Sequence, residues 1–184
     1  MKSFFSLCMV GLVAAGMQAV EAADLKSGLQ VDEFPAAFYV TDITGPSADR
    51  KLCYRCQYGA RPVVSIFVRE MNENTTKLIK DIDTVVGKNS GNKMAAFVTV
   101  LSDDPDQQEA ALKNAAKSSG IAHTPLTVFE NNVGPTKYKI NPKADVTVMM
   151  WVDSNVRVNH ALTADELNAA AIGKIVADTS KILN

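Results

Sequence analysis

Two almost wholly apolar runs constrain the fold of this chain more than any other feature. Val63–Val68 and Ala95–Leu101 are short and rich in β-branched and aromatic residues. Such runs are typical of strands that a parallel sheet buries on both faces. Between them, Glu73–Val86 has the apolar spacing of a helix that ends at Gly87. Its expected buried face consists of Leu78, Ile79, Ile82, Val85 and Val86. The alternation predicts an α/β domain around one sheet.

The rest of the chain continues this alternation. Further strands are expected at Ala37–Ile43, Leu126–Phe129, Val146–Val152 and Val156–Val158. In the third of these, Met149, Met150 and Trp151 are expected to be core residues.

Two more helices are expected from their end signals. Asp104 can cap a helix that has Pro105 at its first position and closes at Gly120. Thr163-Ala164-Asp165-Glu166 reads as a capping box that opens the last helix. The apolar face of this last helix is expected at Leu167, Ala171, Ile172, Ile175, Val176 and Leu183.

The N-terminus has the pattern of an export signal. Lys2 precedes the mostly apolar stretch Phe4–Ala15, and small residues follow up to Ala23. We therefore expect residues 1–22 to be a signal peptide that is cleaved after Ala22, because the apolar run is too short to span a membrane. Cleavage would remove Cys8 and leave a secreted or periplasmic protein. Residues 23–33 lack a packing pattern and are expected to be flexible, and residues 34–184 form the domain.

Composition excludes several classes of function. The net charge of −1 gives no overall basic character that would point to nucleic acid. No basic amphipathic segment indicates a membrane surface, so no membrane insertion is expected after signal cleavage. No glycine-rich phosphate loop stands out, and no cofactor is expected.

The candidate catalytic residues are Cys53 and Cys56, in the sequence Cys53-Tyr54-Arg55-Cys56. Two thiols at this spacing can form a disulfide, exchange it with another protein, or hold a soft metal. Nearby cations lower the pKa of a thiol because they favour the thiolate. We expect four cations to support the pair in this way: Arg50, Lys51, Arg55 and Arg61. A protein thiol or disulfide is the expected partner.

The order of the elements resembles the thioredoxin-like superfamily, in particular its exported and peroxiredoxin-type branches. The segments that carry the resemblance are Phe38–Gly45, Val63–Val68, Ala95–Leu101, Tyr138-Lys139-Ile140, Val146–Asp153 and Val156-Arg157-Val158, with the helices between and after them. The resemblance implies a three-layer α/β/α sandwich around a mixed sheet and a general association with thiol chemistry.

Two landmarks of that superfamily are displaced or absent in this sequence. Its cysteine motif follows the first core strand and opens the next helix, where this chain has Asn72–Thr75 and no cysteine. Cys53 and Cys56 instead precede that strand. The second landmark is a cis-proline that faces the cysteines. Thr124-Pro125 is one candidate for it, whereas the better alignment places it near Ala144–Thr147, where there is no proline.

Two other functions stay open beside thiol–disulfide exchange. A permanent Cys53–Cys56 disulfide would make the chain a degenerate thioredoxin-like domain that binds a partner or is structural. Copper binding or delivery is the other alternative, because two thiolates and one soft or imidazole ligand suffice for Cu(I). Zinc needs four ligands, and His123 and His160 lie far apart in the sequence, so no metal site is assigned.

Overall fold

Seven strands form one mixed sheet in the computed structural model of this protein, which describes residues 25–183. The signal peptide expected at residues 1–22 lies outside the described residues. The strand order is β2-β1-β5-β4-β3-β6-β7. The strands are β1 (Val40–Asp42), β2 (Lys51–Leu52), β3 (Val63–Val68), β4 (Ala95–Leu101), β5 (Leu126–Phe129), β6 (Val146–Val152) and β7 (Asn155–Leu162).

The two apolar runs lie side by side at the centre of this sheet. β3 pairs in parallel with β4, so that Val63 stands opposite Ala95, and it pairs antiparallel with β6 on its other side. Every residue of β3 and β4 is buried. The prediction that the two runs and Val146–Val152 share a single sheet is therefore confirmed.

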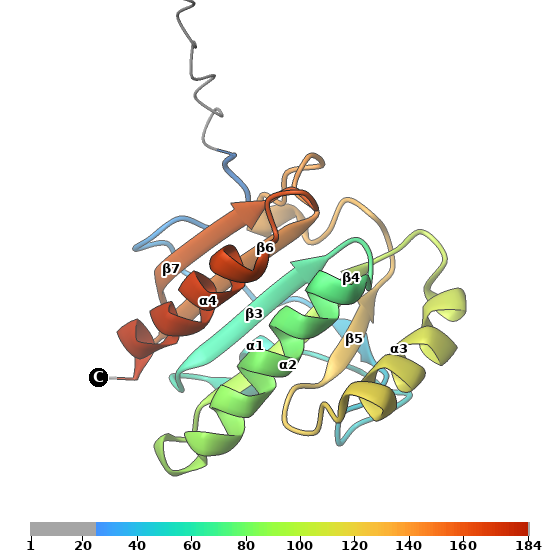
Figure 1. Cartoon of the computed structure of the whole chain (residues 1–184), viewed down its shortest axis with the longest axis horizontal. Coiled ribbons are helices and arrows are strands. Elements are labelled where there is room, and N and C mark those ends of the chain that lie inside the picture. The colour runs from blue at the N-terminus through green and yellow to red at the C-terminus, as the bar shows by residue number, and fades with distance from the viewer. Residues whose placement is uncertain (1–24, 184) are drawn as a thin grey trace, which may run out of the picture.

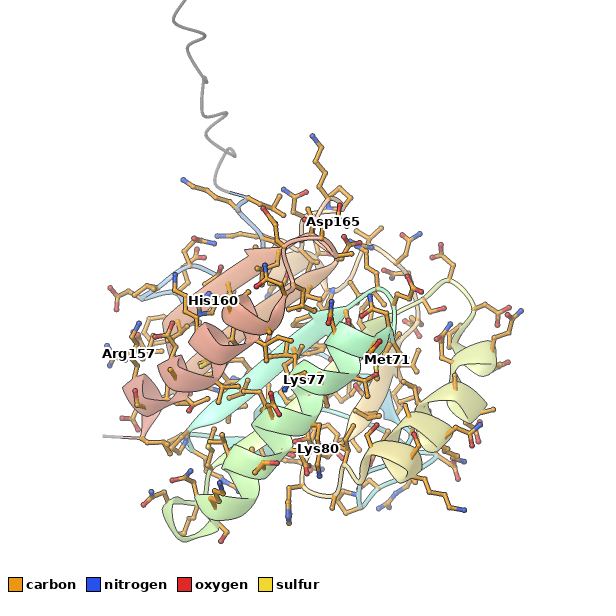
Figure 2. The ribbon with its side chains drawn as sticks, in the orientation of Figure 1. Met71, Lys77, Lys80, Arg157, His160 and Asp165 are labelled. Carbon is orange, nitrogen blue, oxygen red and sulfur yellow. A yellow bond between two sulfur atoms is a disulfide. The ribbon has the colours of Figure 1, made fainter. Side chains whose placement is uncertain are left out.

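One face of the sheet is covered by the three longer helices (Figure 1). These helices are α2 (Glu73–Lys88), α3 (Pro105–Ser119) and α4 (Ala169–Asp178). Their apolar residues form one buried cluster with alternate strand residues such as Ile66 and Val98. Leu78, Ile79 and Ile82 of α2 are fully buried, as the helical spacing predicts. Lys77, on the same helix, is exposed and forms an ion pair with Asp81 (Figure 2).

The opposite face is covered mostly by irregular chain and aromatic side chains. Its cluster includes Phe38, Phe67, Phe97, Tyr138 and Trp151. Among residues 25–183, the helical elements that cover it are short, namely α1 (Tyr54–Tyr58) and the 3₁₀ turn η2 (Thr136–Tyr138). Two further 3₁₀ turns, η1 (Ser90–Asn92) and η3 (Thr179–Ile182), follow α2 and α4. The α/β fold around a mixed sheet is thus as predicted, although helices dominate only one of its two outer layers.

The last helix begins later than the sequence pattern predicts. The Glu166 carboxylate does accept a hydrogen bond from the Thr163 N–H at 2.8 Å, as in a capping box. This capping box stabilises a turn before the helix and does not begin the helix itself. α4 starts at Ala169, and its N-cap is Asn168, whose side-chain oxygen accepts hydrogen bonds from Ala170 N and Ala171 N. β1 is likewise shorter than the strand expected at Ala37–Ile43.

The described part of the N-terminal segment packs against the sheet. Ser27 and Leu29 are buried, and the Asn159 side chain on β7 donates hydrogen bonds to both of their carbonyl oxygens at 2.8 Å. Ser27 Oγ also lies 2.6 Å from Thr147 Oγ1 on β6. Residues 23–33 were expected to be flexible, whereas the described part of this segment is packed. A run without apolar periodicity can still be held by single side chains and by backbone hydrogen bonds.

No helix within residues 25–183 is both long enough and apolar enough to cross a membrane.

The α2 face gives a direct test of the packing. Ile82→Ala should lower the free energy of unfolding by about 2–5 kcal/mol, because it leaves a cavity where the side chain is fully buried. Thr84→Ala, at an exposed position of the same helix, should change it by less than about 0.5 kcal/mol. Urea unfolding of both variants measures the difference. Equal midpoints for the two variants would contradict the assigned face.

Candidate functional site

Cys53 and Cys56 form a disulfide at the start of the short helix α1. Their Cα atoms are 5.2 Å apart. Cys53 is the N-cap residue of the helix, and its Sγ accepts a hydrogen bond from the Cys56 N–H at 3.1 Å. The two residues differ in accessibility, since Cys53 is only 6% exposed whereas Cys56 is exposed. A partner arriving from solvent can therefore reach Cys56 more easily than Cys53.

Tyr54, between the two cysteines, anchors α1 to the sheet. Its ring is buried and stacks on Phe97 of β4, with 5.7 Å between the ring centroids. Its hydroxyl donates a hydrogen bond to Asp42 Oδ2 at 2.7 Å. Burial raises the pKa of the phenol, and the hydrogen bond to Asp42 raises it further, so Tyr54 stays protonated and acts as a structural donor.

Asp42 is the other half of this anchor, and sequence reasoning missed it. The carboxylate is completely buried at the end of β1. Besides Tyr54, it accepts hydrogen bonds from Gly45 N at 2.8 Å and Ser47 N at 2.9 Å. A side chain at Gly45 would place its Cβ only 2.3 Å from the Tyr54 hydroxyl, so glycine is required there. The Asp-x-x-Gly spacing is a turn signal that could have pointed to this loop.

Two of the four predicted supporting cations hold the backbone around α1. Arg55 donates from Nε to Pro35 O and from Nη2 to Ser154 Oγ, both at 2.8 Å. Arg61 donates to Lys93 O at 2.6 Å, and its guanidinium lies 5.1 Å from the centre of the Tyr58 ring. These contacts attach α1 to segments that are remote in the sequence.

The other two cations lie on the solvent side of the site. Arg50 makes a long hydrogen bond of 3.4 Å to Ser47 Oγ, and Lys51 forms an exposed ion pair of 2.8 Å with Glu130. Together with Gln57, which follows Cys56 in the sequence, they line a shallow hollow of about 200 Å³. The structure thus brings Arg50 and Lys51 to one surface beside α1.

The disulfide lies on a different element from the superfamily's usual cysteine position, because it is on α1, which precedes β3. The Tyr58 hydroxyl reaches Ala96 O, at the start of β4, at 3.5 Å. The usual position follows Val68, at the far end of β3. There Asn72 caps α2 by accepting a hydrogen bond from Thr75 N at 2.9 Å.

The second landmark is also absent from the described residues, since residues 25–183 contain no cis peptide bond and Thr124-Pro125 is therefore trans.

The described residues offer no gathered metal ligands. Within residues 25–183, no group of three or more His, Cys, Asp and Glu side chains is arranged to hold a metal ion. His160 pairs with Asp178 at 3.0 Å, and the backbone N–H of His123 donates to Asp83. The structure therefore does not bring either histidine together with the cysteines into such a group.

Similarity to known proteins is found in three-dimensional structure and not in sequence. No family model and no curated protein matches the sequence. A Bacteroides thetaiotaomicron protein proposed to be a protein disulfide isomerase is 14% identical, with a TM-score of 0.65 over 86% of this chain and 94% of its own. The mitochondrial 2-Cys peroxiredoxin of Plasmodium falciparum is 11% identical, with a TM-score of 0.61 over 84% of this chain and 94% of its own. The exposed lipoprotein thioredoxin of Streptococcus pneumoniae is 16% identical, with a TM-score of 0.53 over 78% of this chain and 99% of its own. At these identities the similarity establishes the fold.

Removing the Tyr54 hydroxyl tests the anchor. Tyr54→Phe should lower the free energy of unfolding by about 1–3 kcal/mol, because a completely buried carboxylate loses one of its hydrogen-bond donors. Tyr58→Phe is the matched control, since its hydroxyl makes only a 3.5 Å contact, and it should cost less. Urea unfolding measures both values. A smaller loss for Tyr54→Phe than for Tyr58→Phe would show that Asp42 does not depend on this donor.

Proposed function

We propose that this protein, which has the thioredoxin-like fold, is an exported thiol–disulfide exchange protein that reacts through Cys56. The observation that carries the proposal is the asymmetric disulfide on α1, with an exposed Cys56 bonded to a buried Cys53. The names of the structural neighbours support it, since they include a proposed protein disulfide isomerase, a peroxiredoxin and a thioredoxin. The expected signal peptide and the lipoprotein thioredoxin neighbour support export.

The geometry favours one direction of attack. A thiolate of a partner protein attacks Cys56 Sγ, the Cys53–Cys56 bond breaks, and Cys53 leaves as a thiolate. The Cys56 N–H, which lies 3.1 Å from Cys53 Sγ, stabilises that leaving thiolate by a hydrogen bond. A second thiolate of the partner then attacks the partner's sulfur in the mixed disulfide and releases Cys56. Two electrons thus pass from the partner dithiol to this protein, and the partner leaves as a disulfide.

The four cations have two different roles in this proposal. Arg50 and Lys51 face solvent beside α1, where they attract acidic partners. Arg55 and Arg61 position α1 through their hydrogen bonds to Pro35, Ser154 and Lys93. Arg55→Glu would therefore disturb the attachment of the helix as well as the charge near the thiols.

A permanent disulfide on a binding domain is the second candidate function. The burial of Cys53 favours it, as does the helix cap at Asn72 where the superfamily usually has a cysteine. Copper delivery has no comparable support, because no His, Asp or Glu side chain of residues 25–183 joins the cysteines in a group of three ligands.

A redox titration separates exchange from a permanent bond. Equilibration of the full chain with thiol buffers, followed by alkylation and peptide mass spectrometry, should give a midpoint potential for Cys53–Cys56 above about −300 mV. A lower potential would favour the permanent bond.

Single-cysteine variants test the direction of attack in the same protein. Cys53→Ser retains the exposed Cys56, and Cys56→Ser retains only the buried Cys53. Each variant is first converted by dithiobis(nitrobenzoate) to its mixed disulfide with thionitrobenzoate. A thiolate of a model dithiol protein should then attack the Cys56 disulfide faster than the Cys53 disulfide, forming a protein mixed disulfide and releasing thionitrobenzoate. Each adduct is assigned by peptide mass. The reverse order of rates would show that Cys53 is the attacked sulfur.

The charge of Arg50 should affect the reaction rate with an anionic disulfide reagent more than the rate with an uncharged one. Arg50→Glu in the reduced protein should lower the rate with anionic dithiobis(nitrobenzoate), relative to uncharged hydroxyethyl disulfide, by about two- to fivefold. The comparison of two reagents cancels any change in the thiolate fraction. Lys88→Glu, an exposed lysine at the end of α2, gives the same change in net charge and should leave the ratio unchanged. An equal ratio in both variants would exclude Arg50 from partner recognition.

A further inference from the structure

A groove of about 440 Å³ lies at the β7 edge of the sheet, between the N-terminal segment and α4. We call it the β7–α4 groove and define it by its charged and titratable lining residues: Lys26, Arg157, His160, Lys174, Asp178 and Lys181. Figure 2 shows Arg157 and His160 on the β7 side of the molecule, beside α4. Its lining includes none of the residues that line the hollow beside the disulfide.

Positive charge is concentrated in this groove although the chain as a whole carries −1. Four permanent cations line it, against the single carboxylate of Asp178. That carboxylate is already engaged, with Lys181 Nζ at 2.6 Å from one oxygen and His160 Nε2 at 3.0 Å from the other. Like charges held close together repel one another, and a bound anion would relieve this repulsion.

Three of the cations are available to a ligand. Among the acidic side chains of residues 25–183, Arg157 forms an ion pair with Asp32 alone, at 3.9 Å, and the Asp32 side chain is itself 76% exposed. Lys26 and Lys174 form no ion pair with any acidic side chain of residues 25–183. They project from different walls, Lys26 from the N-terminal segment and Lys174 from α4. An anion between them could therefore contact both walls.

The occupant should be small, because the N-terminal segment already crosses this sheet edge. Asp32 N donates to Val156 O, and Val156 N donates to Glu33 O. Asn159 holds the carbonyl oxygens of Ser27 and Leu29. An extended peptide that paired with β7 would have to displace these bonds, whereas a small anion would not.

We propose that the β7–α4 groove binds the phosphate group of a small ligand. Phosphate fits the donor set, because Arg157 offers a planar guanidinium and the lysines offer compact charges, both of which bind phosphate oxygens well. This assignment is independent of the disulfide and holds whether or not Cys56 exchanges.

His160 provides an internal reporter of binding. Burial lowers its pKa, and the charges of Lys174 and Lys181 lower it further, while Asp178 opposes them. Lys26 and Arg157 are the other charged groups that line the groove around it. A bound phosphate adds negative charge and favours the imidazolium, so phosphate should raise the pH at which His160 titrates. By linkage, protonation of His160 should tighten phosphate binding, and this effect opposes the weakening that inorganic phosphate undergoes when it loses a charge at lower pH.

The test is an NMR titration of the full chain at constant ionic strength, with inorganic phosphate and with glycerol phosphate as probes and sodium chloride as the reference. Saturable shifts should appear at the amides of Lys26, Arg157–Ala161 and Lys174–Lys181, together with an upward shift of the His160 titration. Lys174→Glu should weaken binding about five- to tenfold, since it removes one attraction and adds a repulsion. The matched control Lys117→Glu, at an exposed position near the end of α3, should not weaken it.

Sedimentation with vesicles assigns the source of the phosphate group. Binding to phosphatidylglycerol vesicles, but not to phosphatidylcholine vesicles, that is lost in Lys174→Glu would identify a lipid headgroup. Saturation by the two soluble probes without vesicle binding would identify a soluble ligand. Non-saturating shifts equal to those with sodium chloride, or equal weakening in Lys174→Glu and Lys117→Glu, would overturn the proposal. The lysines would then serve only to keep the β7 edge from pairing with other strands.

Discussion

The buried carboxylate of Asp42 fixes the position of the candidate site. It accepts hydrogen bonds from the loop that follows β1 and from the Tyr54 hydroxyl on α1. A five-residue helix is too short to be stable on its own, so α1 depends on this bond, on the stacking of Tyr54 over Phe97, and on the contacts of Arg55. Because Tyr54 lies between Cys53 and Cys56, the same anchor determines which sulfur is buried and which is exposed.

The disulfide on α1 and the β7–α4 groove lie at different places on the sheet. β3 is central and pairs with β4 and β6 along its whole length, so its two ends are held apart. The disulfide lies on α1, which precedes β3, whereas the superfamily's usual cysteine position follows β3, where Asn72 caps α2. The β7–α4 groove lies at an edge of the sheet, where β7 has a strand neighbour on one side only.

Apolar periodicity predicted the elements well and their ends less well. The runs Val63–Val68 and Ala95–Leu101 have the predicted strand bounds, and Leu78, Ile79 and Ile82 form the predicted buried face. Thr163–Glu166 was misread as the start of a helix, because a capping box can close a turn equally well. Ser27 and Leu29 were not expected to pack, since they are held by Asn159, a residue distant in the sequence, and not by any local pattern.

The sequence by itself determined the α/β alternation, the central strands, and the pair Cys53 and Cys56 with four nearby cations. These features depend on local spacing, which the chain carries whatever its tertiary structure. Only the tertiary structure decided that Cys53 is buried and Cys56 is exposed. It also decided that Arg55 and Arg61 donate hydrogen bonds to backbone carbonyl oxygens, while Arg50 and Lys51 face solvent. It likewise brought Lys26, Arg157 and Lys174 into the lining of one groove. The physical reason is that burial and the convergence of charges depend on contacts between segments far apart in the sequence, such as Tyr54 with Asp42 and Arg55 with Ser154, which no local pattern encodes.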